Sequence, residues 1–277
     1  MEAKDRALSS GTETSGTETS GAETNVEPAE VKSGGYIFLI SAVAAAGGLL
    51  FGFDTAIVAG AQVYFRREFQ LDDLATVIAV SSLLVGCVLG ASAAGWSSDR
   101  FGRKRMLIAA AILFAVSAVG AALPRTVVEF ILARLVGGVA IGVTSMLSPL
   151  YIAEVAPADR RGRLVTLNQT AIITGILAAY VIAYFLADTG PANWRWMFGL
   201  AAIPALGLWI ALHFVPESPR WLVKQGRKDE AFAVLSRIGG RLHAGSELKE
   251  IEEAAAAEVE LALSQLFRPG LRTALVI

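Results

Sequence analysis

Apolar residues occur along most of this chain in blocks of about twenty, and charged residues gather between the blocks. A hydrocarbon layer about 30 Å thick needs about 20 apolar residues in helical form, so each block is long enough to cross a membrane. The predicted spans cover residues 36–63, 74–97, 106–123, 127–151, 164–187 and 195–215. Glycine and alanine are frequent in all six, which is typical of membrane helices that pack closely. Soluble core helices remain the alternative, although six of this length in series would be unusual.

The residues beyond the last span follow a different pattern. In 228–240 and 246–267, apolar residues recur every three or four positions and acidic residues come early, which predicts two amphipathic helices separated by Gly239 and Gly240. The predicted fold is therefore an all-α membrane protein. It consists of a six-transmembrane-helix bundle over 34–215 and cytoplasmic amphipathic linker helices over 216–267.

The two ends of the chain differ from both regions. Residues 1–33 contain a Ser-Gly-Thr-Glu repeat without side chains that could bury surface, so we expect a disordered tail. This segment has no basic start and no short apolar core, and so does not resemble a signal peptide. Residues 268–277 begin a new apolar run, and we expect the start of a truncated seventh span there.

Charge placement predicts the orientation of the spans. Of the 277 residues, 18% are charged, against about 25% in a typical soluble domain. Basic residues are concentrated in one set of loops, around 100–105, 160–163 and 220–228, and are sparse in the opposite set. By the positive-inside rule the richer set is cytoplasmic, so we expect a multi-pass protein of the plasma or inner membrane with a cytoplasmic N-terminus. The single cysteine, Cys87, excludes a disulfide within the chain.

The segment GWSSDRFGRKR, residues 95–105, places five charges between two apolar blocks. Asp99 precedes Arg103 by four residues, and Arg103, Lys104 and Arg105 open the third span. A loop that only sets topology needs basic residues, but neither a carboxylate nor glycines at fixed positions. We interpret the segment as a cluster that holds helices together by charge-assisted hydrogen bonds and releases them when they move. Exposed pairs of this kind contribute only about 0–1 kcal/mol each.

Three motifs resemble those of a known family. The segment 95–105 is similar to the G-x-x-x-D-R-x-G-R-[RK] signature of the major facilitator superfamily. PESPRWL at 216–222 resembles the marker of its sugar porter family, and 147–169 resembles the family's segment between the fourth and fifth spans. The resemblance implies the N-terminal half of a transporter that moves a sugar by alternating access between two six-helix bundles. It also implies an inner-face network of charges that holds the bundles together, formed here by Asp99, Arg103, Lys104, Glu154, Arg161, Glu217 and Arg220.

Two ionisable residues lie within the spans. At 1.5 Å per residue, Asp54 is about 9 Å from an outer end near Gly60, and Arg134 is about 12 Å from an outer end near Thr126. A lone charge at that depth is costly, so we expect the two to pair or to meet a water-filled cavity. From the residues alone, a static ion pair and a proton site are equally open. The resemblance favours proton coupling by Asp54 and Arg134, because proton-coupled sugar porters have aspartate in the corresponding F-G-[YF]-D segment.

The resemblance also implies contacts for the sugar. Gln169 matches a glutamine that hydrogen-bonds sugar hydroxyls, Ile172 and Ile173 match apolar pocket positions, and Phe51 matches an aromatic residue near the site. Ile176 replaces a glutamine of some proton–pentose relatives, which leaves the sugar open. A glutamine that packs against a neighbouring span is the alternative for Gln169.

These observations indicate a secondary transporter and not an enzyme. The sequence has no nucleophile–base pair, metal-binding cluster or phosphate-binding loop, so we predict no cofactor, no metal and no nucleic acid partner. The predicted partners are a sugar, protons, membrane lipid and the missing C-terminal half. The alternative is a half-transporter that does not transport, and is inert or associates with a complementary half.

Overall fold

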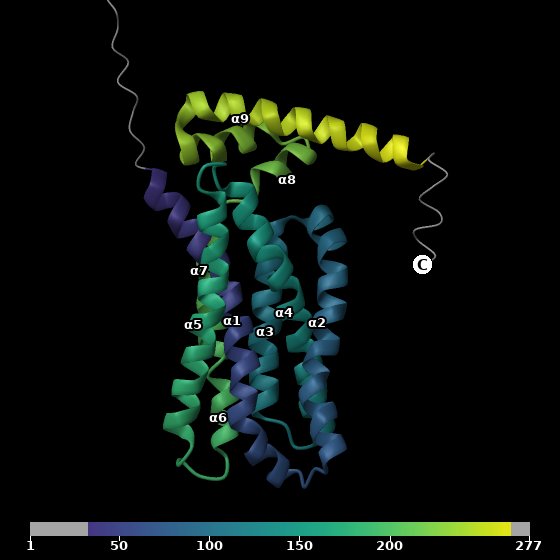
Figure 1. Ribbon diagram of the computed structural model, residues 1–277, viewed down its shortest axis with the longest axis vertical. Coiled ribbons are helices and arrows are strands. Elements are labelled where there is room, and N and C mark those ends of the chain that lie inside the picture. Colours follow the sequence, from purple (N-terminus) through teal and green to yellow (C-terminus); the bar gives the residue numbers. More distant parts are fainter. Residues whose placement is uncertain (1–32, 267–277) are drawn as a thin grey trace, which may run out of the picture. The chain divides into compact units, whose positions relative to one another are not determined.

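The protein is described from a computed structural model, which covers residues 33–266 and the side chains of 34–257. All regular elements in this part of the chain are helices (Figure 1). They are α1 (Ser33–Glu68), α2 (Asp73–Phe101), α3 (Arg103–Ala122), α4 (Val127–Val155), α5 (Arg161–Leu186), α6 (Asn193–Gly199), α7 (Ala202–His213), α8 (Pro219–Lys224) and α9 (Lys228–Leu266). The predicted tail, apart from Ser33, and the predicted start of a seventh span lie outside the described residues.

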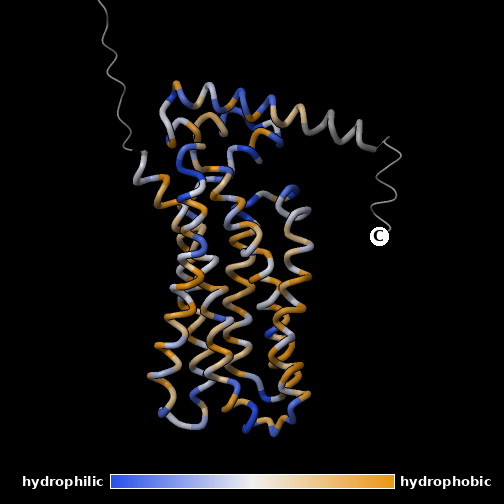
Figure 2. The backbone as a smooth tube through the Cα atoms, in the orientation of Figure 1, coloured by the Kyte–Doolittle hydropathy of each residue, from blue (hydrophilic) through white to orange (hydrophobic). Residues whose placement is uncertain are grey.

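Six stretches of this bundle are long and apolar enough to cross a membrane, which confirms the predicted fold class. Five of them are α1 to α5, and α6 with α7 forms the sixth, over Asn193–His213. Apolar residues dominate the bundle, whereas polar residues are frequent in α8, α9 and the turns at the opposite end (Figure 2). We call the two ends of the bundle the α8–α9 end and the loop end.

Most helices extend past the predicted spans because polar residues continue or cap them. The carboxylate of Asp72 accepts a hydrogen bond from the amide of Ala75 at 2.7 Å and so begins α2. At the other end of α2, Gly102 has a φ of +99°, a conformation that favours glycine, and it separates α2 from α3. The charged segment 95–105 therefore comprises the last turns of α2, the reversal at Gly102 and the start of α3.

The sixth predicted span is found over Asn193–His213, with a local tightening of the helix near its middle. Leu200 and Ala201, between α6 and α7, keep right-handed helical backbone angles, but the amide of Ala201 donates to the carbonyl of Phe198, three residues earlier. Pro204 contributes to this tightening because it has no amide hydrogen to donate to the carbonyl of Leu200. That carbonyl accepts instead from Ile203, at 3.1 Å, in a tighter turn. Phe198, one residue before the end of α6, is buried in the bundle.

Glycines let pairs of helices approach until their backbones touch. A Cβ atom on Gly86 of α2 would overlap the carbonyl oxygen of Leu135, and one on Gly138 of α4 would overlap that of Leu83. The same holds between α1 and α5, where a Cβ atom on Gly52 would overlap the carbonyl oxygen of Ile172. Between α1 and α4, which carry the intramembrane charges, Gly47 lies against Ser148, so these two helices also pack closely.

The helices at the α8–α9 end form a small core of their own. Within α9, Gly240 has a non-helical conformation, with φ +83° and ψ +166°, so the element consists of two helices joined at the predicted glycine pair. The buried side chains of Trp221 and Leu222 in α8 pack with Ala244 and Ile251 of α9. The amphipathic faces predicted for this region are thereby covered by one another.

Candidate functional site: a buried ion pair and a charged cluster

The two charges predicted within the membrane spans meet. In α4, Nη1 of Arg134 lies 2.6 Å from Oδ1 of Asp54 in α1, and both side chains are buried, with 2% and 7% exposed. The contact involves one nitrogen and one oxygen. Asp54 Oδ2 and Arg134 Nε are also buried and have no hydrogen-bond partner among the described residues. A buried pair with unsatisfied atoms gains less from its Coulomb attraction than a fully hydrogen-bonded one.

The pair lies deeper along α1 than the sequence predicts. Because α1 continues to Glu68, Asp54 is fourteen residues, or about 21 Å, from the end of the helix. Arg134 is seven residues, or about 10 Å, from the start of α4 at Val127. The predicted 9 Å was counted from an outer end near Gly60, whereas the helix continues through Arg66 and Arg67 to Glu68.

A cluster of aromatic rings covers the pair on the side of the loop end. The guanidinium carbon of Arg134 lies 5.2 Å from the centre of the ring of Phe198. Phe198 contacts the rings of Phe130, at 5.4 Å, and Trp194, at 6.3 Å. The sequence analysis did not identify Phe198. The sequence shows an aromatic residue, Phe130, one helical turn before Arg134, but nothing that relates Phe198 to the arginine.

A second group of charges gathers at the α8–α9 end, around Arg103. Its Nη1 lies 2.8 Å from Oδ1 of Asp99 and its Nε lies 3.1 Å from Oε2 of Glu154. The side chains of Arg103 and Glu154 are only 6% and 8% exposed. The prediction of weak exposed pairs is therefore wrong for this contact, because α2, α3 and α4 converge on it and shield it from solvent.

Glu217 joins this cluster through backbone groups. Its Oε1 accepts hydrogen bonds from the amide of Lys104, at 3.0 Å, and from the amide of Ser218, at 2.9 Å. The ammonium group of Lys104 donates to the carbonyl of His213, also at 3.0 Å. Glu217 therefore caps the first turn of α3 and links it to the start of α8. The indole of Trp221 adds a further link by donating to the carbonyl of Asp99 at 2.9 Å.

Of the remaining two predicted members, Arg220 lines one cavity of about 310 Å³ with Asp99, Arg103 and Glu154. Arg161 and Arg220 form no ion pair with any described residue, and Nε of Arg161 is buried without a partner there. Both line a cavity of about 530 Å³ together with Glu247, Glu250 and His243. Five members of the predicted network are thus joined by ion pairs and hydrogen bonds. Arg220 lies beside them at a shared cavity, and Arg161 lines only the neighbouring one.

Comparison with known proteins identifies the family. Residues 40–277 match the sequence profile of the family described as "Sugar (and other) transporter". The chain belongs to this sugar transporter family. Its members are transporters and not enzymes.

Relatives and solved structures of the sugar transporter family agree with this assignment. The chain is 43% identical over 259 residues to the arabinose-proton symporter of Bacillus subtilis, covering 91% of this chain and 56% of that protein. It is 41% identical to the D-xylose-proton symporter of Escherichia coli, covering 78% of this chain and 51% of that protein. The structure of the major facilitator superfamily proton:xylose symporter XylE bound to 6-bromo-6-deoxy-D-glucose has a TM-score of 0.77 and 40% identity, covering 80% of this chain and 53% of that one. The chain spans about half the length of the curated relatives it matches.

The residues that the family resemblance assigns to sugar binding lie on α1 and α5. Phe51 of α1 and Ile172 of α5 are half-buried, and Ile172 approaches the α1 backbone at Gly48. Gln169 and Ile173 are exposed, and most of α5 presents an open face. These side chains therefore flank one helix interface, with two of them pointing away from this bundle.

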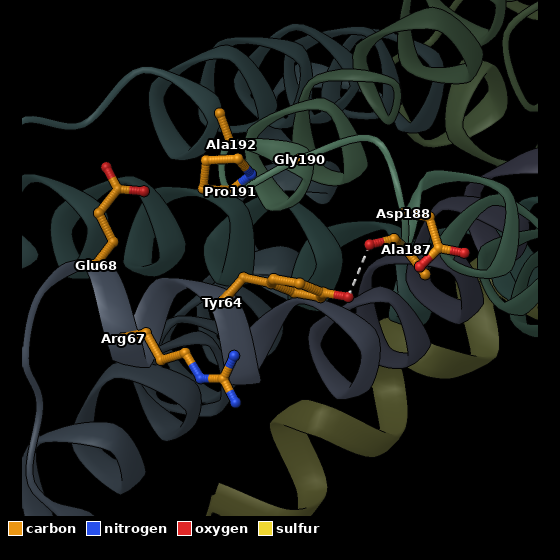
Figure 3. A pocket seen from close by; sticks show the side chains of 8 residues that line it. All are labelled: Tyr64, Arg67, Glu68, Ala187, Asp188, Gly190, Pro191 and Ala192. Carbon is orange, nitrogen blue, oxygen red and sulfur yellow. Dashed lines mark hydrogen bonds between the residues drawn. The ribbon is translucent and has the colours of Figure 1, made fainter.

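A cavity of about 630 Å³ at the loop end contains none of the predicted residues (Figure 3). It is lined by Tyr64, Arg67, Glu68 and the α5–α6 connection, and the hydroxyl of Tyr64 donates to the carbonyl of Ala187 at 3.0 Å. Glu68 contacts Nη2 of Arg195 at 2.6 Å and the indole nitrogen of Trp194 at 2.7 Å. These contacts fasten α6 to the end of α1 and so support the aromatic cluster.

Proposed function

We propose that this chain forms one six-helix half of a sugar–proton symporter, and that Asp54 and Arg134 bind the coupled proton. The observation that carries the proposal is the buried contact between these two side chains, 2.6 Å apart on α1 and α4. Similarity to proteins named arabinose-proton and D-xylose-proton symporters supports both the sugar and the proton.

The incomplete hydrogen bonding of the pair suits a proton site better than a static contact. Oδ2 of Asp54 is buried without a partner among the described residues, and we place the proton on this oxygen. A proton there neutralises the carboxylate and weakens its attraction to Arg134, so the two helices can separate at a small cost. A charged carboxylate released from its partner inside the membrane would be far more costly.

We propose that the sugar binds where α1 and α5 meet the second half of the carrier. The amide of Gln169 offers both a donor and an acceptor to sugar hydroxyls, while Ile172, Ile173 and Phe51 contact the apolar faces of the ring. The exposure of Gln169 and Ile173 supports this assignment, because a shared site requires side chains that this bundle leaves open.

We further propose that the carrier works by alternating access, with the α8–α9 end in the cytoplasm. The basic loops at that end support this orientation through the positive-inside rule. Arg103, Asp99 and Glu154 hold α2, α3 and α4 together within this half. Arg161 and Arg220 form no ion pair within this half, so we propose that they bind carboxylates of the second half. These contacts would then break when the inner side opens.

The test is uptake of labelled sugar by cells that express this chain together with the second half of the Bacillus subtilis arabinose-proton symporter. We expect accumulation against a gradient that a proton uncoupler abolishes. Asp54→Asn should abolish accumulation and leave exchange of sugar across the membrane. Asp188→Asn, at an exposed aspartate of the α5–α6 connection, is the matched control and should accumulate sugar as the unaltered chain does.

Each other outcome contradicts part of the proposal. Normal accumulation by Asp54→Asn would remove the pair from proton coupling. Uncoupler-resistant uptake would indicate a facilitator, and an absence of uptake in the presence of the second half would favour a half-transporter that does not transport.

A further inference from the structure

Arg134 contacts only one of the two carboxylate oxygens of Asp54. Arginine and a carboxylate commonly pair through two parallel hydrogen bonds, which satisfy both oxygens. Here only Nη1 reaches Asp54, through Oδ1, while Nε and Oδ2 stay buried without partners among the described residues. The guanidinium also has a contact of a different kind, with an aromatic ring.

The ring of Phe198 is that contact. It is 1% exposed, and its centre lies 5.2 Å from the guanidinium carbon of Arg134. A guanidinium placed over an aromatic ring is attracted by the ring's electrons, most strongly where water is excluded. The ring therefore competes with Asp54 for the orientation of the planar guanidinium.

Phe198 cannot easily turn away, because its neighbours hold it on several sides. Its ring packs edge-on against Phe130 of α4 and Trp194 of α6, with interplanar angles of 70° and 80°. Trp194 is itself anchored by its hydrogen bond to Glu68 at the end of α1.

We infer that Phe198 is a positioning residue for the proton-coupling pair, an inference that rests on the proposed function. Its ring holds the guanidinium of Arg134 so that a single nitrogen grips Asp54, and this leaves Oδ2 free to take the proton. Without the ring, the guanidinium turns to grip both oxygens and keeps the carboxylate charged. The coupled cycle then stalls, although sugar can still exchange.

The first test reads the position of the guanidinium on this chain alone, in lipid nanodiscs, by NMR of arginine labelled with ¹³C and ¹⁵N. The signals of Arg134 are assigned from their absence in Arg134→Lys. We expect its guanidinium protons to be shifted upfield by the ring current of Phe198. The shift should persist in Phe198→Tyr, which keeps the ring, and disappear in Phe198→Leu. Phe69→Leu removes a ring that contacts Trp194 but has no ring contact with Phe198 or Arg134, and it should leave the shift unchanged.

The second test measures transport with the assembled carrier described above. Phe198→Leu should lower the accumulation ratio by about tenfold and change exchange by less than about twofold, as expected when a buried cation–π contact is lost. Phe198→Tyr should restore accumulation to within about twofold. In the Asp54→Asn background, Phe198→Leu should have no further effect, because the group that the ring serves is already gone.

The inference is overturned if the Arg134 signals of Phe198→Leu match those of the unaltered chain, or if Phe69→Leu changes them equally. It is also overturned if Phe198→Leu lowers exchange as much as accumulation, which is what a purely structural ring would do. Failure of the unaltered carrier to accumulate sugar would instead refute the proposed function and leave the NMR result standing by itself.

Discussion

Replacing Arg103 tests whether the charged cluster at the α8–α9 end is structural. Arg103 contacts Asp99, whose side chain is 63% exposed, and Glu154, whose side chain is 8% exposed. The exposed contact contributes little, about 0–1 kcal/mol. The buried contact decides the outcome, because Arg103→Met leaves the carboxylate of Glu154 buried without its partner. Removal of one partner from a buried pair costs about 3–5 kcal/mol.

The assay is reversible unfolding of the chain in mixed micelles as the fraction of a denaturing detergent is raised. Circular dichroism monitors the loss of helix. We expect Arg103→Met to lower the free energy of unfolding by about 3–5 kcal/mol. The double variant Arg103→Met with Glu154→Leu should recover most of that loss, because no buried charge is then left alone. Arg66→Met breaks the exposed pair between Arg66 and Asp73 and serves as the control, with an expected cost of about 0–1 kcal/mol.

Two results would refute this reasoning. A loss below about 1 kcal/mol for Arg103→Met would mean that water reaches Glu154 and that the pair behaves like an exposed one. A double variant as unstable as the single one would show that the loss comes from packing of the arginine stem and not from the isolated carboxylate.

The remaining predictions concern helix packing and an exposed ion pair. Gly138→Leu should separate α2 from α4, because its side chain would overlap the carbonyl oxygen of Leu83, and a thiol reagent should then label Cys87 faster. Gly245→Leu, with nothing within 4 Å, is the control, and equal labelling rates would contradict the packing argument. The hydrogen bond from Arg227 lowers the pKa of Glu230, so the support that this pair gives to the start of α9 is present above the unfolded-state pKa and is lost as pH falls through the folded one. A carboxylate NMR titration should therefore place the Glu230 midpoint lower in the unaltered chain than in Arg227→Ala, and identical midpoints would exclude the contact.

Hydrophobic patterning was sufficient for the existence and order of the six spans, because water and hydrocarbon impose them directly on the sequence. It was insufficient for their ends. Asp72 caps a helix outside the apolar region, and Arg66 and Arg67 continue one, so neither depends on burial. The local tightening near Leu200 follows from Pro204, whose missing amide hydrogen is evident from the sequence. Hydropathy averaged over a window does not detect it.

The candidate site was predictable only as far as charge reveals it. Asp54 and Arg134 stand out because a membrane span rarely contains ionisable residues. Phe198 does not stand out, since phenylalanine is ordinary in such a span, and only the three-dimensional contact shows that it lies against the arginine. The contact between Lys104 and Glu217 could not be predicted either. Lys104 donates its backbone amide to Glu217, and every residue except proline carries that group.

Arg103 and Arg134 are both buried in this bundle, but they differ in how many hydrogen bonds hold the guanidinium group. Arg103 has hydrogen-bond partners for its Nε and Nη1 atoms on Glu154, Asp99 and the carbonyl of Ser98, so any movement of the guanidinium breaks several contacts at once. Arg134 makes one such bond, and its guanidinium carbon lies 5.2 Å from the centre of the Phe198 ring, a contact that is less directional than a hydrogen bond. The unpaired atoms of Asp54 and Arg134 therefore fit the proposed proton site, whereas the several contacts of Arg103 fit a structural role within this bundle.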